Sequence, residues 1–153
     1  MQKRLFRSNM IGKLTLVCAF LYIFSVSGKK YDRCQLAHEL LDKYKFPKDQ
    51  ISTWICIVEH ESQFDTNAYN SDTKDHGLFQ ISELYWCEPP AHPNGCHVQC
   101  SALHDDNIDD DVRCVKQVFE ETQRLKNNGF EAWTTYPKYC KGNTASYIQG
   151  CNI

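Results

Sequence analysis

The chain has 153 residues, of which 17 are Lys or Arg and 19 are Asp or Glu, and this length suits one domain with a short additional segment. The formal net charge is −2, and it becomes −6 without the first 28 residues, which carry four basic and no acidic side chains. A negative chain has no long-range attraction for anionic polymers, which argues against nucleic acid as a partner and against killing by adhesion to anionic membranes.

The first 28 residues have the three-part pattern of a secretory signal peptide. A basic start precedes an almost unbroken apolar run over 14–26, and small residues follow it. A membrane anchor is the alternative, but the run is shorter than the roughly 18 apolar residues that a spanning helix needs. We therefore expect cleavage near Ser27 or Gly28, an extracellular protein with no membrane anchor, and a single domain over 29–153.

Nine cysteines are present, and Cys18 lies inside the predicted signal peptide. An even number of cysteines in a small exported domain indicates a disulfide framework, although eight cysteines allow 105 pairings. A zinc site is the rival interpretation, because Cys96-His97-x-x-Cys100 has the look of a ligand cluster. The eight remaining cysteines are Cys34, Cys56, Cys87, Cys96, Cys100, Cys114, Cys140 and Cys151.

Apolar residues spaced by three and four positions predict two helices in the first part of the domain. The first covers 32–44 and is broken by Phe46-Pro47, because proline cannot continue a helix. The second covers 51–61 and carries Trp54 on its apolar stripe.

The composition then changes, because turn-forming residues crowd into 67–77. A short strand is predicted to follow over 77–81. This pattern predicts a small antiparallel hairpin or three-stranded sheet. Three prolines and a glycine in 87–100 predict an irregular loop tied by disulfides.

The longest predicted helix covers 109–125, with three aspartates in its first turn and basic residues near its end, as the helix dipole favours. Asn127-Asn128-Gly129 is expected to stop it. A further helical segment is expected over 131–136. Helices followed by a small sheet and more helices predict an α+β domain with two lobes and a cleft between them.

Two carboxyl groups could carry acid-base chemistry, provided that their surroundings separate their pKa values. Glu61 closes an apolar helix, where burial would raise its pKa. Asp75 lies in a polar stretch, where a carboxylate can stay ionised. Position alone does not distinguish the pair from solvated surface acids, which are the commoner case.

The region from about Lys30 to Ile153 resembles C-type lysozymes and their α-lactalbumin relatives, and all eight cysteines follow that family's order. The motifs are long and jointly specific. They are Cys56-x-x-x-x-Glu61-Ser62-x-Phe64, Asp75-x-Gly77-Leu78-Phe79-Gln80-Ile81, Tyr85-Trp86-Cys87, Cys100-Ser101-Ala102-Leu103, Ala132-Trp133 and Cys140-Lys141-Gly142.

The resemblance implies a role for each matched residue. Glu61 matches the general acid that protonates the leaving sugar oxygen, and Asp75 matches the carboxylate that attacks or stabilises the sugar cation; lysozyme is itself the reference case for this division. Trp133 matches the indole that packs on the acid and raises its pKa. The expected substrate-binding residues are Tyr85, Trp86, Trp133, Gln80 and Ser82.

The resemblance also implies the disulfide pairing. The expected bridges are Cys34–Cys151, Cys56–Cys140, Cys87–Cys100 and Cys96–Cys114. The first of them would close a loop of almost the whole domain. In the chain-entropy model, closing a loop of about 100 residues stabilises the folded state by about 4.7 kcal/mol.

Three departures from the family pattern all concern Asp75. Ser82 stands where the family usually has an asparagine that hydrogen-bonds the second carboxylate. His76 replaces a usual tyrosine, and the segment between Glu61 and Asp75 is shorter than in vertebrate members. These departures predict reduced or altered activity more readily than loss of activity, because both carboxylates are present.

Five aspartates fall within seven residues over 105–111, where they would repel one another without a cation. Calcium binds six to eight oxygens, often from carboxylates and carbonyls. An acidic helix start is the alternative, but it does not account for Asp105 at the family's spacing. The resemblance implies a structural calcium site with carboxylates from Asp105, Asp110 and Asp111 and carbonyls from Ala102 and Asn107.

The sequence therefore predicts a secreted, monomeric glycoside hydrolase that cleaves β-1,4 linkages in bacterial peptidoglycan by a retaining mechanism, in an antibacterial or digestive setting, without a cofactor for catalysis. The alternative is a catalytically weak or inactive relative that binds calcium and sugar.

Overall fold

The computed structural model describes residues 28–88 and 93–153. Except for Gly28, the predicted signal peptide lies outside the described residues, as do residues 89–92 of the predicted loop over 87–100. Where that loop is described it consists of turns, bends and an isolated bridge between Glu88 and Gln99, as its prolines predict. In the described parts of the chain, every helix is too short or too polar to cross a membrane.

The N-terminal predicted helix is α1 (Arg33–His38), which continues as a π-helical turn η1 (Glu39–Lys43). Asp32 caps it, because its carboxylate accepts hydrogen bonds from the backbone N–H groups of Cys34 and Gln35. A 3-10 turn η2 (Lys48–Gln50) then leads into α2 (Ile51–Ser62).

The longest helix is α3 (Asp109–Lys126), and it ends where Asn127 adopts a left-handed conformation with a φ of 60°. Val112, Val115 and Val118 are buried along one face. Leu125, which the helical pattern places beside that face, is 74% exposed, because it lies in the last turn beyond the core.

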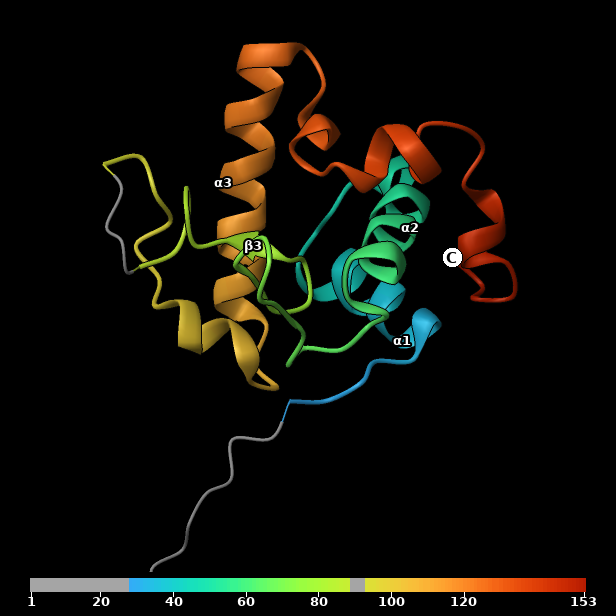
Figure 1. Cartoon of the computed structure of the whole chain (residues 1–153). Helices are drawn as coiled ribbons and strands as arrows, with labels where there is room; N and C mark the ends of the chain where they lie inside the picture. Colours follow the sequence, from blue (N-terminus) through green and yellow to red (C-terminus); the bar gives the residue numbers. More distant parts are fainter. Residues whose placement is uncertain (1–27, 89–92) are drawn as a thin grey trace, which may run out of the picture.

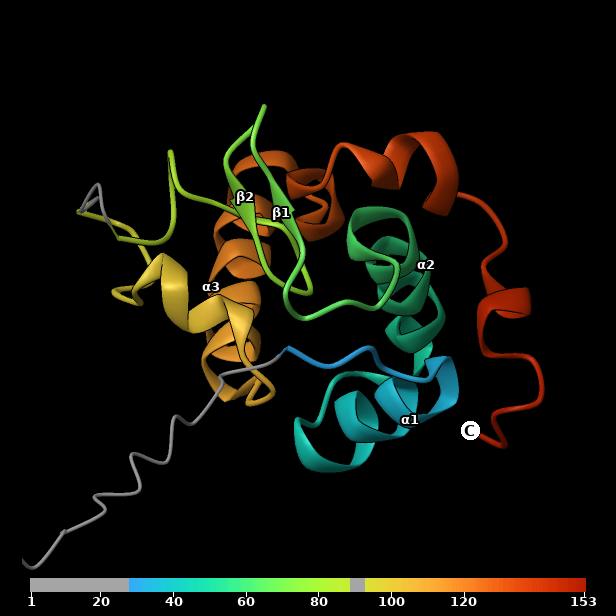
Figure 2. The same cartoon turned by 60° about the horizontal axis from the view of Figure 1, so that its bottom comes forward.

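The sheet has three short antiparallel strands in the order β1 (Tyr69–Asn70), β2 (Asp75–His76) and β3 (Ile81–Ser82). In Figure 1 the sheet lies in front of α3, and in Figure 2 β1 lies on the side of α3 that faces α2. A three-stranded sheet is therefore confirmed, and the register pairs Asp75 with Ser82 and His76 with Ile81.

The prediction of a strand over 77–81 is wrong for 77–80, which form the turn between β2 and β3, and right only for Ile81, which begins β3. Gly77 has a φ of +74°, and a Cβ there would lie 2.1 Å from the carbonyl oxygen of Leu103. The Gln80 amide donates hydrogen bonds to the Ala68 and Gly77 carbonyls and so closes the turn. Its apolar residues, Leu78 and Phe79, are buried in the core, and this burial explains their strand-like pattern.

Short helical turns complete the fold: η3 (Cys100–His104), η4 (Gly129–Ala132), η5 (Tyr136–Cys140) and η6 (Ala145–Ile148). The predicted helical segment over 131–136 is wrong in its middle, since η4 ends before Trp133 and η5 begins at Tyr136. The segment that carries η6 runs along the outer side of α2 (Figures 1 and 2).

The core surrounds Trp54 of α2, which is 1% exposed. Its ring packs edge-on against Phe46, Phe130 and Trp133, with centroids 5.0–5.3 Å apart. Four disulfides enclose this core, and their pairing is the one that the family resemblance implies. They are Cys34–Cys151, Cys56–Cys140, Cys87–Cys100 and Cys96–Cys114.

Candidate active site

A cleft of about 450 Å³ lies between the sheet, the end of α2 and the segment around Trp133. It brings together all seven residues that the sequence predicts for catalysis and sugar binding, although they come from three separate parts of the chain. These residues are Glu61, Asp75, Gln80, Ser82, Tyr85, Trp86 and Trp133.

Glu61 lies in the last turn of α2, a helix whose inner face is apolar and buried. Burial raises the pKa of its carboxyl group, and the charge of Asp75 adds to the rise. The Thr135 hydroxyl opposes this effect, because it donates a hydrogen bond of 2.6 Å to Oε1. A carboxyl group with a raised pKa keeps its proton to higher pH and can serve as a general acid.

Trp133 forms the wall of the cleft nearest to the core and is 6% exposed. Its Nε1 donates a hydrogen bond of 2.9 Å to the carbonyl of Phe79, in the turn between β2 and β3. Its ring packs edge-on against Trp54, with centroids 5.0 Å apart. The indole is therefore fixed between the core and the sheet, on the same cleft that Glu61 lines.

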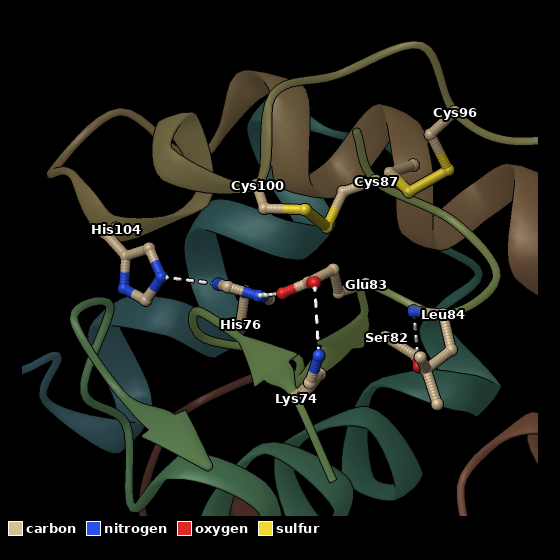
Figure 3. Close-up of a disulfide and its surroundings, with 10 residues drawn as sticks. Lys74, His76, Ser82, Glu83, Leu84, Cys87, Cys96, Cys100 and His104 are labelled. Carbon is tan, nitrogen blue, oxygen red and sulfur yellow. Dashed lines mark hydrogen bonds and ion pairs between the residues drawn. A yellow bond between two sulfur atoms is a disulfide. The ribbon is translucent and has the colours of Figure 1, made fainter. Parts of the chain in front are cut away.

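Asp75 is the first residue of β2, and Ser82 of β3 is its partner across the sheet. The Ser82 hydroxyl accepts a hydrogen bond of 3.3 Å from the backbone N–H of Leu84 (Figure 3). Among the described residues, no hydrogen bond joins this hydroxyl to Asp75. Ser82 therefore supports the following turn, whereas the family's usual asparagine is expected to reach the carboxylate.

His76, next to Asp75, is buried, and its side chain links β2 to Glu83, the residue after β3, and to His104 of η3. Its Nδ1 lies 2.8 Å from Nε2 of His104, and its Nε2 lies 3.2 Å from a carboxylate oxygen of Glu83. Lys74 approaches the other oxygen of Glu83 at 3.8 Å. Figure 3 shows His104, His76 and Glu83 in a row below the Cys87–Cys100 disulfide, with Lys74 joined to Glu83 from below.

Two of the three aromatic residues predicted to bind sugar, Tyr85 and Trp86, differ in exposure. Tyr85 is 65% exposed, whereas Trp86 is partly buried against the core. Both line the cleft, together with the exposed Leu84. Exposed aromatic surface beside polar groups is suited to stacking against the apolar faces of sugar rings.

The predicted calcium loop leads from η3 into α3, and Asp111 provides the test of its fit. This residue is 1% exposed, and its Oδ1 has no hydrogen-bond partner. Burial, together with the charges of Asp110 and Asp105, raises the pKa of Asp111 to about 8. A buried, unpartnered carboxylate oxygen next to two further carboxylates has the donor chemistry that calcium requires.

The other two predicted carboxylate ligands, Asp105 and Asp110, accept local backbone hydrogen bonds. Oδ1 of Asp105 accepts a hydrogen bond from the Asn107 N–H at 2.7 Å, and Oδ1 of Asp110 accepts one from the Asp111 N–H at 3.2 Å. The loop residues therefore fit the ion by their chemistry and by the unpartnered oxygen of Asp111, but in this structure the three carboxylates do not come within 4.8 Å of one another.

The rival zinc interpretation is not supported, because Cys96 and Cys100 belong to two different disulfides and offer no thiolate. Within the described ranges, the one group of three potential ligands whose atoms lie within 4.8 Å of one another is His76, Cys87 and Cys100. Two of these three residues form a disulfide with each other.

Sequence reasoning missed three residues around the site: Thr135, Glu83 and His104. The contact of Thr135 with Glu61 joins positions 74 residues apart, and no pattern in the sequence links them. The alternation of side chains along a strand could have placed His76 on the opposite face from Asp75, but it could not have identified His104 as its partner.

The fold and the cleft define a lysozyme-like protein with a carboxylate pair, and comparisons with known proteins identify the family. Residues 29–151 match the model of the C-type lysozyme/alpha-lactalbumin family, and the chain belongs to that family. The family assignment and the named relatives make it an enzyme of the lysozyme class of glycosidases.

The relatives come from both vertebrates and invertebrates. The milk isozyme of lysozyme C from Canis lupus familiaris is 36% identical over 134 residues, which cover 82% of this chain and all of the relative. Lysozyme 2 from Lucilia sericata is 37% identical over 145 residues, which cover 90% of this chain and 96% of the relative. The crystal structure of a lysozyme from Litopenaeus vannamei aligns with a TM-score of 0.73 at 34% identity, over 82% of this chain and 98% of that chain.

Proposed function

We propose that this protein is a secreted muramidase that hydrolyses the β-1,4 bond between N-acetylmuramic acid and N-acetylglucosamine in bacterial peptidoglycan. The observation that carries the proposal is the pair of carboxyl groups in one cleft, with burial raising the pKa of Glu61. Family membership and the named lysozyme relatives support the same substrate class.

The proposed reaction retains the configuration of the sugar and proceeds in two steps. In the first step, Glu61 transfers its proton to the glycosidic oxygen as the bond from C1 to that oxygen breaks, while the Asp75 carboxylate attacks C1 or stabilises its positive charge. In the second step, water gives a proton to the Glu61 carboxylate and its oxygen to C1. This step releases Asp75 and restores the acid.

The other cleft residues are proposed to bind the glycan. Tyr85 and Trp86 would stack on sugar rings, and Gln80, Ser82 and Trp133 would line the path of the strand past the carboxyl pair. We propose that the mature protein covers 29–153 and acts as an extracellular monomer. Its predicted charge of −6 favours a digestive or specialised role over that of a basic bactericidal protein.

Lysis of purified cell walls by the mature protein and by Glu61→Gln tests the assignment. Glutamine keeps the size of the side chain but cannot donate the acid proton, so we expect lysis to fall to near background. Glu120→Gln, at an exposed position of α3, is the matched control and should lyse walls as the unmodified protein does. Equal rates for the protein and its Glu61→Gln variant would remove Glu61 as the acid.

A second candidate function is a weak or inactive relative that binds sugar. It is favoured by the Ser82 hydroxyl, which bonds to Leu84 and not to Asp75. Binding of a chitin-type oligosaccharide without its cleavage, in a preparation whose fold is intact, would support this candidate against the muramidase.

We also propose that the loop over 102–111 binds a structural calcium ion. The carboxylates of Asp105, Asp110 and Asp111 and the carbonyls of Ala102 and Asn107 would hold it. The unpartnered oxygen of Asp111 supports this proposal. The ion would offset the repulsion among these aspartates and would take no part in catalysis.

A further inference from the structure

The segment between η4 and η5 makes a direct polar contact with the proposed acid. Thr135 is half-buried, and its Oγ1 lies 2.6 Å from Oε1 of Glu61. The hydroxyl donates the bond, and Oε1 accepts it either as a carboxylate oxygen or as the carbonyl oxygen of the protonated group. Both this hydrogen bond and one from the Thr135 backbone lower the pKa of Glu61.

Few other charged groups act on Glu61. Asp75 from β2 faces it across the cleft and disfavours its ionisation. Lys74 and Asp72 line the same cleft, but Lys74 pairs with Glu83 at 3.8 Å. On α2 itself, His60 stacks on Tyr139 and bonds to Tyr147, away from the cleft.

We propose that Thr135 is a positioning residue. Its hydroxyl fixes Oε1 of Glu61 and thereby sets the upper pH limit of the reaction. The inference deepens the proposed muramidase function and takes its catalytic meaning from it. The bond from the hydroxyl to an ionised carboxylate is charge-assisted, whereas the bond to a protonated carboxyl group is neutral and about half as strong. Thr135 therefore stabilises the ionised form more than the protonated form.

Two consequences follow for the chemistry. Burial of Glu61 favours the bound proton, and Thr135 limits that effect, so that the group releases its proton more readily during bond cleavage. Because Oε1 accepts the hydrogen bond, the acid proton is directed to Oε2. The same contact thus controls both the strength of the acid and the oxygen from which the proton leaves.

The test uses three substitutions in the mature protein. Thr135→Val keeps the volume and the branched shape but removes the hydroxyl. Thr135→Ser keeps the hydroxyl. Thr135→Ala is a second variant without the hydroxyl, in case valine disturbs packing. For each, the Glu61 carboxyl is titrated by carbon-13 NMR, with Glu61→Gln to identify the signal, and the pH profile of kcat/KM for wall lysis is measured.

We expect Thr135→Val and Thr135→Ala to raise the Glu61 pKa and the basic limb of the profile by about one pH unit. Thr135→Ser should leave both within a few tenths of a unit. An unchanged Glu61 titration in a folded Thr135→Val or Thr135→Ala variant overturns the inference, as does an equal change in Thr135→Ser. The titration needs no turnover, so a protein that fails to lyse walls would overturn the muramidase function while still testing Thr135.

Discussion

At the scale of single residues, the Glu61 carboxyl group lies at the end of a helix with an apolar inner face and accepts a hydrogen bond from Thr135. Asp75 lies on a strand, opposite a serine whose hydroxyl is bonded elsewhere. The family resemblance selected both acids, because the helix end and the polar stretch by themselves did not distinguish them from solvated surface acids. The sequence could not identify Thr135, since that contact depends on how distant segments pack.

The burial of Glu61 has a cost for stability that depends on pH. Its pKa is raised in the folded state, so the cost grows as the pH rises from the pKa of the unfolded chain to that raised value, and it is complete above it. Below the pKa of the unfolded chain, the side chain is protonated in both states and the cost disappears. Glu61→Gln should therefore raise Tm relative to the unmodified protein at pH 8 but not at pH 3. Thermal unfolding at the two pH values measures this, and an equal difference at both would contradict it.

At the scale of elements, the apolar segment over 77–81 shows where pattern reasoning fails. Leu78 and Phe79 are buried as a strand would bury them, but Gly77 and Gln80 have positive φ angles and form a turn. Periodicity records burial and not backbone direction, so a short buried turn and a short buried strand give the same signal. The long, regular helices α2 and α3 were predictable to within a residue at their ends.

The sheet is held to η3 by the His76 ring, which contacts both Glu83 and His104. His76→Gln should lower the free energy of unfolding by about 1–2 kcal/mol, because at least one partner is left without its bond in a buried setting. Chemical denaturation measures the change. The control is His97→Gln, since His97 also pairs with a glutamate but its side chain is 70% exposed. This control should change the free energy of unfolding by no more than about 0.5 kcal/mol. Comparable losses in both variants would refute the role of His76 in holding the sheet to η3.

At the scale of the whole molecule, four disulfides and one aromatic core join the helices to the sheet. The family resemblance was sufficient to pair the cysteines, whereas the cysteines by themselves allowed 105 arrangements. The Cys34–Cys151 bridge joins residues 117 positions apart and so restrains both ends of the described domain. The cleft lies on a framework that is restrained covalently as well as by packing.

Calcium should stabilise this framework as a whole, because an ion that binds only the folded state adds to its free energy of unfolding. At a concentration a hundred times the dissociation constant, the gain is about 2.7 kcal/mol, or several degrees in Tm. We expect millimolar calcium to raise Tm relative to a chelator. Asp105→Asn should abolish the rise, and Asp106→Asn, at an exposed neighbouring position, should keep it. A Tm that does not respond to calcium would exclude the site.

The three tryptophans of the chain occupy three different environments. Trp54 is in the core, Trp133 contacts it from the cleft wall, and Trp86 lies partly exposed at the cleft itself. Their fluorescence therefore differs in how easily a dissolved quencher reaches it. Such a quencher reaches Trp86 first, and a bound glycan would shield Trp86. The intrinsic fluorescence of the unlabelled protein can thus report occupancy of the cleft separately from the integrity of the core.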